Sequence, residues 1–183
     1  MATAKKTKQR YNDALKDLQK DLQCKNVMSV PHVEKVVVNV GVGKYIKNNE
    51  ALDELEAGLR DITGQKPVRT KARKSISGFK IREGQDVGMK ATLHGQRMWD
   101  FLDRLIGVAL PRVRDFHGIP IRAIDEGGNL NIGVQEHTIF PEIVAENVKN
   151  PFGLQITVVS TADNKEDAEK LYRVLGFPLQ KEE

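Results

Sequence analysis

Residues 33–41 read Val-Glu-Lys-Val-Val-Val-Asn-Val-Gly, and this stretch decides the fold. Its β-branched side chains favour an extended backbone, so it predicts a strand. Alternate residues of a strand face opposite ways, which places Val36, Val38 and Val40 on one face. The other face carries Lys35, Val37 and Asn39. The strand therefore has one apolar face and one mainly polar face.

Three further stretches, 87–94, 129–134 and 154–161, alternate in the same way. Their polar sides carry mostly lysine, threonine, asparagine and glutamine, for example Lys90, Thr92, Asn131, Gln155 and Thr157. Helical periodicity appears in residues 8–23, 48–62, 96–110 and 164–175. Helices can cover only the apolar face of such a sheet. The pattern predicts an α+β fold: a two-layer sandwich of a mainly antiparallel sheet, with helices on one face and an open polar face.

Capping and breaking residues mark the predicted ends of the helices. Asn48 or Asn49 can cap the second helix and Gly64 can end it, while Pro111 is expected to stop the third. The fourth is expected to be capped by Asn164 and closed by Gly176 and Pro178. Residues 67–74 look extended. With no repeat or linker, residues 1–183 are predicted to form a single domain, and residues 1–7 a frayed basic tail.

Composition limits the class of protein. The chain has 183 residues, of which 39% are hydrophobic and 30% charged, as in a globular protein with a polar surface. No apolar run approaches the length needed to span a bilayer, so no membrane partner is expected. The first ten residues lack the apolar core of a secretory signal. The single cysteine, Cys24, cannot form an internal disulfide, which fits a reducing compartment.

Basic charge is concentrated in residues 65–82. Seven of these eighteen residues are Lys or Arg and none is acidic, whereas the rest of the chain has 22 basic and 25 acidic side chains. Such a segment suits the neutralisation of phosphates. Arg69, Lys71 and Arg73 follow the period of a strand, so they are predicted to form a charged row beside the open face. A merely solvated sheet face is the simpler alternative, but the basic row favours RNA.

Other chemistries find no support in the sequence. The four histidines lack the spacing of metal ligands, so neither a metal nor a cofactor is predicted. Gly41 and Gly43 follow a strand, but the third glycine of a dinucleotide-binding fingerprint would fall at Ile46. Asp125 and Glu126 precede two glycines and are interpreted as turn residues. The signatures of two common RNA-binding modules also fail, and no catalytic constellation is visible, so the chain is not predicted to be an enzyme.

Five strings in order carry a resemblance to a known family. They are Val-Asn-Val-Gly-Val-Gly (38–43), Thr-Gly-Gln-Lys-Pro (63–67), Thr-Lys-Ala-Arg-Lys-Ser-Ile-Ser-Gly-Phe-Lys-Ile-Arg (70–82), Pro-Arg-Val-Arg-Asp-Phe (111–116) and Ile-Phe-Pro-Glu-Ile (139–143). Through them the chain, from about residue 11 to residue 181, resembles the bacterial type of ribosomal protein five of the large subunit, the 5S rRNA-binding family.

The resemblance implies a structural constituent of the large ribosomal subunit, located in the cytoplasm within the ribosome. Its implied partners are 5S rRNA, 23S rRNA, P-site tRNA, small-subunit ribosomal protein thirteen and other proteins of the central protuberance. The 5S rRNA site would comprise Asn39, Gln65, Lys66, Lys71, Arg73, Lys90 and Thr92. A loop over 74–84 would contact tRNA through Lys74, Ser75, Ser77, Gly78, Phe79, Lys80 and Arg82. An intersubunit bridge would use Arg112, Arg114, Gln135, Glu136 and Glu142.

The chain departs from the family pattern at several positions. The family usually has an apolar residue where Arg69 stands, and it commonly reads Phe-Asp-Gly-Arg-Gly-Asn-Tyr where residues 124–130 read Ile-Asp-Glu-Gly-Gly-Asn-Leu. A basic residue is usual at Gln135, and arginine is common at His117. Phe79 could stack on RNA or anchor its loop to the domain. The rival hypotheses are an RNA-directed enzyme and an RNA chaperone outside the ribosome.

Overall fold

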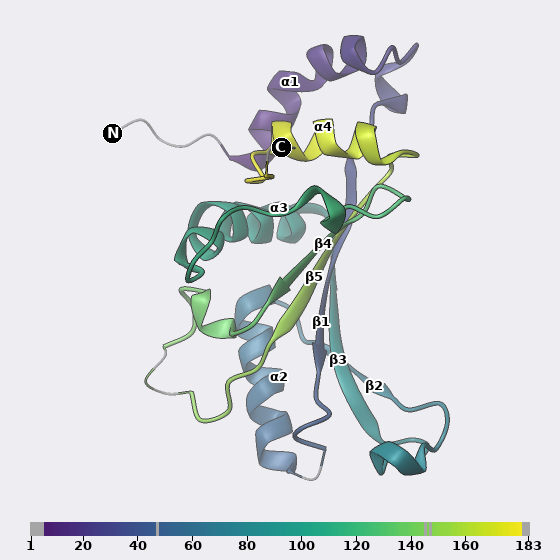
Figure 1. Cartoon of the computed structure of the whole chain (residues 1–183). Coiled ribbons are helices and arrows are strands. Elements are labelled where there is room, and N and C mark those ends of the chain that lie inside the picture. The colour runs from purple at the N-terminus through teal and green to yellow at the C-terminus, as the bar shows by residue number, and fades with distance from the viewer. Residues whose placement is uncertain (1–5, 47, 145, 147, 181–183) are drawn as a thin grey trace. The chain divides into compact units, whose positions relative to one another are not determined.

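The computed structural model describes residues 6–46, 48–144, 146 and 148–180. Within these residues a five-stranded antiparallel sheet has the strand order β2-β3-β1-β5-β4 (Figure 1). The strands are β1 (Val33–Gly41), β2 (Val68–Lys71), β3 (Asp86–Leu93), β4 (Leu130–Val134) and β5 (Leu154–Ser160). The α-helices are α1 (Thr7–Asp21), α2 (Asn49–Thr63), α3 (Gly95–Arg104) and α4 (Lys165–Leu175). The predicted α+β fold is confirmed.

The chain divides into two compact units. Unit 1 consists of Met1–Val36, His94–Ile132 and Thr157–Glu183, and unit 2 of Val37–Leu93 and Gly133–Ile156. Unit 1 contains α1, α3 and α4, and unit 2 contains α2, β2 and β3. The single domain over 1–183 stays a prediction. Residues 1–5 of the expected basic tail lie outside the described residues, and Thr7 already belongs to α1.

The strand that decides the fold is observed at the predicted bounds. Val36, Val38 and Val40 of β1 are at most 1% exposed, whereas Asn39 between them is exposed. Burial of a valine side chain stabilises the fold by roughly 1.5–3 kcal/mol, so this face belongs to the core. The alternation of β-branched residues therefore sets both the strand and its orientation.

Helix α2 is bounded by the residues that the sequence suggests. The side chain of Asn48, not that of Asn49, accepts a hydrogen bond from the Ala51 amide at 3.2 Å. At the other end, Gly64 adopts the left-handed conformation with φ of 67° and donates its N–H to the Arg60 carbonyl at 2.7 Å. Between these caps, Leu52, Leu55, Leu59 and Ile62 are buried. The helix thus presents one apolar stripe to the core of unit 2.

The prediction that Pro111 stops the third helix is wrong. The α-helical part of α3 ends at Arg104, a π-helical turn follows over Leu105–Ala109, and a 3₁₀ turn covers Leu110–Arg112. Pro111 lies in the first turn of that last segment, where a missing N–H breaks no helical hydrogen bond. The residues predicted to face inward are buried nonetheless: Met98, Phe101, Leu102, Leu105 and Ala109.

Helix α4 also differs in detail from its prediction. Asn164 occupies the N-cap position, but its side chain makes no hydrogen bond to the helix. Instead, Glu166 and Asp167 lie in the first turn, where negative charge is favourable beside the helix N-terminus. The C-terminal end is as predicted, because Gly176 has φ of 93°. Helix α4 contacts α1 within unit 1.

Candidate nucleic-acid interface

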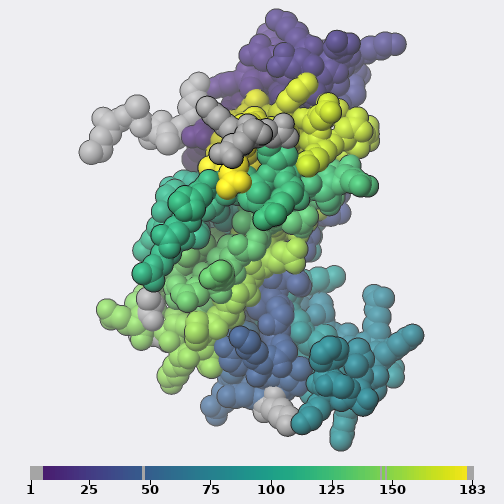
Figure 2. Space-filling model, viewed as in Figure 1, coloured from purple at the N-terminus to yellow at the C-terminus, as the bar shows by residue number. Residues whose placement is uncertain are grey.

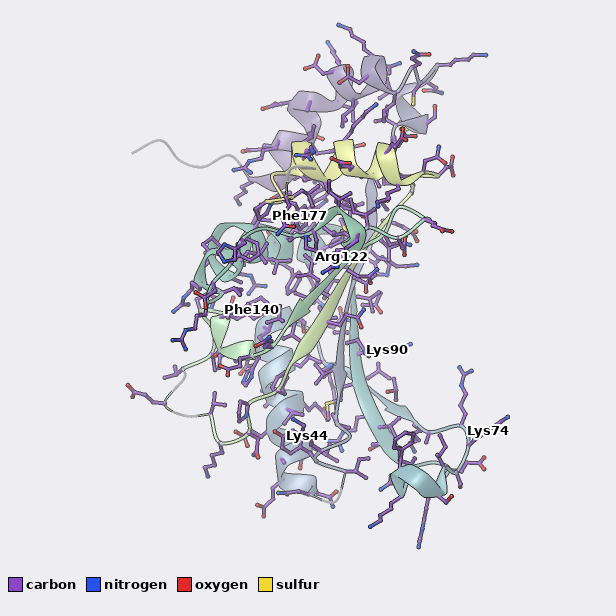
Figure 3. All side chains as sticks on the ribbon, in the orientation of Figure 1. Lys44, Lys74, Lys90, Arg122, Phe140 and Phe177 are labelled. Carbon is purple, nitrogen blue, oxygen red and sulfur yellow. The ribbon has the colours of Figure 1, made fainter. Side chains whose placement is uncertain are left out.

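Unit 2 has a sheet face that carries polar side chains. Asn39 on β1 and Lys90 on β3 are exposed, and Thr92 on β3 is half-buried. The neighbouring residues of β3 point the other way and form core: Met89, Ala91 and Leu93 are at most 2% exposed. In Figure 3, Lys90 lies on β3 on the side away from α2. Within this unit the helix covers one face of the sheet and leaves the other to solvent.

The register of β2 adds two residues that the sequence analysis missed. Val68 pairs with Lys90, and Thr70 pairs with Gly88, so both lie on the same side as Lys90. Val68 is 60% exposed. Nothing in the sequence marks an apolar β-branched residue as part of a polar face, since only its pairing partner places it there. We call Asn39, Val68, Thr70, Lys90 and Thr92 the open face.

Gly88 lets the edge strand approach closely at this face. A Cβ atom there would lie 2.8 Å from Thr70 Oγ1 and 3.2 Å from the Val40 carbonyl oxygen. Both separations are shorter than ordinary van der Waals contact, so a side chain would push against β1 and β2. The close packing of the three strands at the open face therefore depends on the lack of a side chain at position 88.

The predicted charged row of Arg69, Lys71 and Arg73 is wrong. Arg69 pairs with Met89, a buried residue, and therefore lies on the covered side of the sheet. A bulge shifts the pairing register with β3 between Thr70 and Lys71, and β2 ends at Lys71. Arg73 lies beyond the strand. The extra residue, Val87, lies in β3 and not in β2, so the misplaced row is explained by the pairing of Arg69 with Met89 and not by the spacing within β2.

The remaining predicted 5S rRNA residues fall on two sides of the unit. Gln65 Nε2 donates a hydrogen bond to the Thr92 carbonyl at 3.3 Å, which brings Gln65 to the end of the open face. Lys66 is exposed, but its Nζ lies 3.6 Å from Glu56 Oε1 on α2. Lys71, the last residue of β2, and Arg73, in the loop that follows, are both exposed. The structure thus brings Asn39, Gln65, Lys90 and Thr92 to one face but leaves Lys66 beside the helix.

The loop between β2 and β3 has a defined backbone conformation that hydrogen bonds hold. Its base is closed by hydrogen bonds from the Ala72 amide to the Gln85 carbonyl (2.8 Å) and from the Gly84 amide to the Ala72 carbonyl (3.0 Å). Farther out, Ile76 and Ile81 form an antiparallel bridge with bonds of 2.9 and 3.1 Å. A 3₁₀ turn over Ser77–Phe79 makes the tip. These bonds hold the tip residues on a defined backbone.

The tip of this loop is fully accessible. The predicted tRNA-contacting residues are all exposed: Lys74, Ser75, Ser77, Gly78, Phe79, Lys80 and Arg82. Phe79 is 75% exposed, so it does not anchor the loop to the domain. The teal side chains of this region project from the surface of unit 2 in Figure 2. Ser75 Oγ accepts a hydrogen bond from the Glu83 amide at 3.0 Å, and the other loop side chains remain available for contact.

Ion pairing distinguishes two groups of cations in unit 2. Arg69 and Lys66 face carboxylates of α2 at 2.6–3.6 Å. Among the described residues, no ion pair is formed by Lys90 of the open face, by Lys71 at the end of β2, or by the loop cations Arg73, Lys74, Lys80 and Arg82. Positive charge that is left uncompensated in this way attracts polyanions. We call these six residues the unpaired cations.

The predicted bridge residues belong to both units. Arg112, the last residue of the 3₁₀ turn, and Arg114 are exposed in unit 1. In unit 2, Gln135 and Glu136 are exposed and Glu142 is half-buried. The segment that carries the latter three is held at His137, whose amide donates to the Phe152 carbonyl at 3.1 Å. The His137 ring also stacks on Phe152, with ring centres 3.9 Å apart and planes 9° apart.

His137 gives this segment a pH dependence. The residue is 3% exposed, and Nδ1 accepts a hydrogen bond from the Phe152 amide at 3.4 Å, which requires an unprotonated Nδ1. Burial lowers the pKa of His137 below its ordinary 6.5, although the Phe152 hydrogen bond and the charges of Glu54 and Glu136 oppose this shift. The unfolded chain therefore takes up a proton first as pH falls through 6.5.

We expect the free energy of unfolding to fall between pH 6.5 and the lower pKa of folded His137. The variant His137→Phe keeps an aromatic ring to stack on Phe152 and removes the titration. Its free energy of unfolding should depend less on pH in this window than that of the parent protein. Urea unfolding at a series of pH values measures the difference. Identical pH profiles for the two proteins would contradict the prediction.

The described residues show neither a metal centre nor a membrane span. No group of three or more His, Cys, Asp or Glu among them could hold a metal ion. No described helix is long and apolar enough to cross a bilayer. Asp125 acts as the turn residue that the sequence suggests, because its carboxylate accepts the Asn129 amide at 2.7 Å.

Comparisons with known proteins agree with this architecture. The family model described as ribosomal protein L5 matches residues 26–82, and the model described as the C-terminus of the same ribosomal family matches residues 86–179. The large ribosomal subunit protein uL5 of Syntrophomonas wolfei is 51% identical over 168 residues, which cover 92% of this chain and 94% of that protein. The uL5 proteins of Pediococcus pentosaceus and Dehalococcoides mccartyi (strain BAV1) are 48% and 45% identical, each over 97% of this chain and 99% of their own length.

These matches extend over nearly the whole chain, and identities of 45–51% are high enough to indicate a common fold and role. They confirm the resemblance that the five sequence strings indicated. The chain is a structural, RNA-binding component of the large ribosomal subunit and not an enzyme, and it belongs to the ribosomal protein L5 family.

Proposed function

We propose that this chain binds 5S rRNA through the open face of unit 2 and helps to attach it in the central protuberance of the large subunit. The observation that carries the proposal is the ion-pairing contrast: helix-side cations are matched by carboxylates, and the six unpaired cations are not. Asparagine and threonine side chains on the same face offer hydrogen bonds to ribose hydroxyls. Shape and phosphate contacts, not base sequence, then determine recognition.

The loop between β2 and β3 serves a second RNA in this proposal, the P-site tRNA. Its tip presents Lys80 and Arg82 as charges and Phe79 as an exposed ring able to stack on a base or a sugar. The hydrogen bonds at Ala72 and at Ile76 hold the tip in place before RNA arrives, which lowers the entropic cost of binding. The unpaired cations thus divide between two RNAs.

The bridge to the small subunit is the third part of the proposal. Exposed Arg112 and Arg114 and the segment with Gln135, Glu136 and Glu142 would meet small-subunit ribosomal protein thirteen. The presence of both signs of charge suits a protein partner, since complementary charges fix register across an interface. Contacts to 23S rRNA and to neighbouring proteins of the central protuberance complete the proposed environment.

Salt dependence of 5S rRNA binding tests the first part. If Lys71, Arg73 and Lys90 each neutralise one phosphate, the logarithm of the affinity should fall with the logarithm of salt concentration at a slope of roughly −2 to −3. The slope is measured by filter binding of the purified chain and 5S rRNA over a range of salt concentrations. A slope near zero would sink the proposal.

A loop variant separates the two RNAs. In Phe79→Ala/Lys80→Ala, the substituted side chains are exposed and the backbone bonds at the loop base are kept. Binding of 5S rRNA should remain within about twofold of the parent, because the open face is untouched. A large loss of 5S rRNA affinity would show instead that the loop tip belongs to the 5S rRNA site.

A further inference from the structure

The side chain of Arg69 forms ion pairs with two carboxylates of helix α2. Its Nη2 lies 2.6 Å from Asp53 Oδ1 and 2.6 Å from Glu56 Oε2, and its Nε donates to Glu56 Oε2 at 2.8 Å. Asp53 and Glu56 are three residues apart on the helix and therefore share one side of it. One guanidinium thus joins the edge strand to two acids one turn apart on the helix, and charge-assisted bonds of this length are among the stronger ones.

A third carboxylate faces the same guanidinium. Asp86 Oδ2, at the start of β3, lies 3.9 Å from Arg69 Nη1. Asp86 Oδ1 is buried without a hydrogen-bond partner among the described residues. The hydrogen bonds that Arg69 donates to Asp53 and to Glu56 raise its pKa. Without the arginine, three carboxylates would lie together, and in the part of the chain that the structure describes only Lys66 Nζ, 3.6 Å from Glu56 Oε1, would compensate them.

Because Arg69 lies in the edge strand β2, its link to α2 affects the position of that strand. The strand β2 has four residues and pairs with β3 alone, so it is held by hydrogen bonds on one side only. The bulge between Thr70 and Lys71 follows at once, and the loop begins beyond it. Val68 and Thr70, on either side of Arg69, belong to the open face. Any movement of β2 away from α2 would therefore displace both the open face and the loop.

We propose that Arg69 is a positioning residue for RNA binding: its guanidinium clips β2 to α2 and neutralises the carboxylates of Asp53, Glu56 and Asp86. It makes no contact with phosphate itself. The register places its guanidinium on the covered side of the sheet, away from the open face, because Arg69 pairs with buried Met89. The effect on RNA rests on the proposed 5S rRNA function, whereas the clip between strand and helix does not.

Hydrogen exchange tests the clip without RNA. In Arg69→Leu, the β2 amides and the bonded amides of Ala72 and Gly84 should exchange about tenfold faster, while those of β1 stay unchanged. The double variant Asp53→Ala/Glu56→Ala removes both acceptors of the same link from the helix side and should give the same pattern. If Arg69→Leu fails to fold, the double variant alone tests whether the link holds β2 to α2. Unchanged exchange in both variants would overturn the proposal.

Salt titration of 5S rRNA binding tests the positioning role. Arg69→Leu should weaken binding by about tenfold at fixed salt with the slope unchanged, because no phosphate contact is lost. The matched variant Lys90→Leu should lower the magnitude of the slope by about one and leave β2 exchange as it is. A slope change in Arg69→Leu equal to that of Lys90→Leu would overturn the proposal.

A third variant separates the two proposed effects of Arg69, namely the link between β2 and α2 and the neutralisation of the carboxylates. Adding Asp53→Asn and Glu56→Gln to Arg69→Leu removes two of the carboxylates that the arginine had compensated. Affinity should then recover in part while exchange of β2 stays fast. If affinity stays at its Arg69→Leu level, neutralisation is excluded. If the parent protein does not bind 5S rRNA, the proposed function fails and the exchange measurements alone decide the clip.

Discussion

Gly128→Ala is expected to lower the free energy of unfolding by about 3 kcal/mol, whereas Gly127→Ala should change it by less than about 0.5 kcal/mol. Gly128 has φ of 73°, a conformation that costs other residues about 1–2 kcal/mol. Its added Cβ would also lie 2.9 Å from the Ala162 carbonyl oxygen and 3.0 Å from Ala162 Cβ. These atoms lie just after the end of β5, so the chain must shift to make room.

The carbonyl of Gly128 makes the cost larger. It accepts hydrogen bonds from Tyr172 Oη at 2.8 Å and from Ser160 Oγ at 2.7 Å. Tyr172 is fully buried, and its hydroxyl also lies 3.0 Å from the Val158 carbonyl. A displaced turn would leave these buried hydroxyls poorly bonded, at a penalty of about 1–3 kcal/mol each if the bond is lost. The turn therefore connects α4 to the edge of the sheet in unit 1.

Gly127 is a matched control one residue away. A Cβ there would meet Asn129 Nδ2 at 3.5 Å and Asp125 Oδ1 at 3.6 Å, which are ordinary contacts. In the family pattern that the chain resembles, the position of Gly127 carries arginine and that of Gly128 carries glycine. Urea unfolding of the two variants measures the difference. Equal losses would contradict the prediction, since they would show a general sensitivity of the turn and not a requirement at one position.

The strands and their faces could be predicted because the alternation in each is local. Val36, Val38 and Val40 identify the core side of β1 from nine consecutive residues. The facing of β2 could not be predicted, because it depends on pairing with β3, which lies farther along the chain beyond a loop. The bulge after Thr70 has no signature in the sequence. The spacing of Arg69, Lys71 and Arg73 was therefore a correct pattern with a wrong interpretation.

The role of Arg69 could not be predicted either, because it depends on a contact between charged side chains of different elements. The sequence places Asp53 and Glu56 on one side of α2, since they are three residues apart. It does not show that a cation of β2 meets them, because that contact depends on how helix and strand pack. The acid-free segment 65–82 looked uniformly available for phosphate, yet two of its cations face carboxylates from outside the segment. Local composition could not distinguish paired from unpaired charge.

The backbone of the third helix and of the loop tip was also beyond the sequence. Pro111 predicted an abrupt end of the third helix. Instead, a π-helical turn and a 3₁₀ turn accommodate the proline, and the stripe of apolar side chains stays buried. In the loop, Lys80 adopts a left-handed conformation with φ of 55°, which a lysine rarely favours. The bonds of Ile76 to Ile81 impose this conformation on the tip. Sequence identified the loop, and the hydrogen bonds gave it a shape.

The triple variant Asn39→Ala/Lys90→Ala/Thr92→Ala is expected to bind 5S rRNA about 1000-fold more weakly while its free energy of unfolding changes by less than about 1 kcal/mol. The three residues lie on the open face, and their backbone hydrogen bonds in the sheet are kept. A hydrogen bond between two neutral groups contributes about 1 kcal/mol, and one from a charged lysine about 1.5–3 kcal/mol. Together these values correspond to roughly the stated loss of affinity.

The salt slope identifies which part of this loss is electrostatic. Only one of the three side chains is charged, so the magnitude of the slope should fall by about one and not by three. The matched control is Arg60→Ala, which removes an exposed cation from α2 on the covered side of unit 2. That variant should bind within about twofold of the parent, because net charge alone has a small effect at moderate salt. A loss of stability above about 2 kcal/mol in the triple variant would show that this face is core, and an unchanged affinity would show that RNA binds elsewhere.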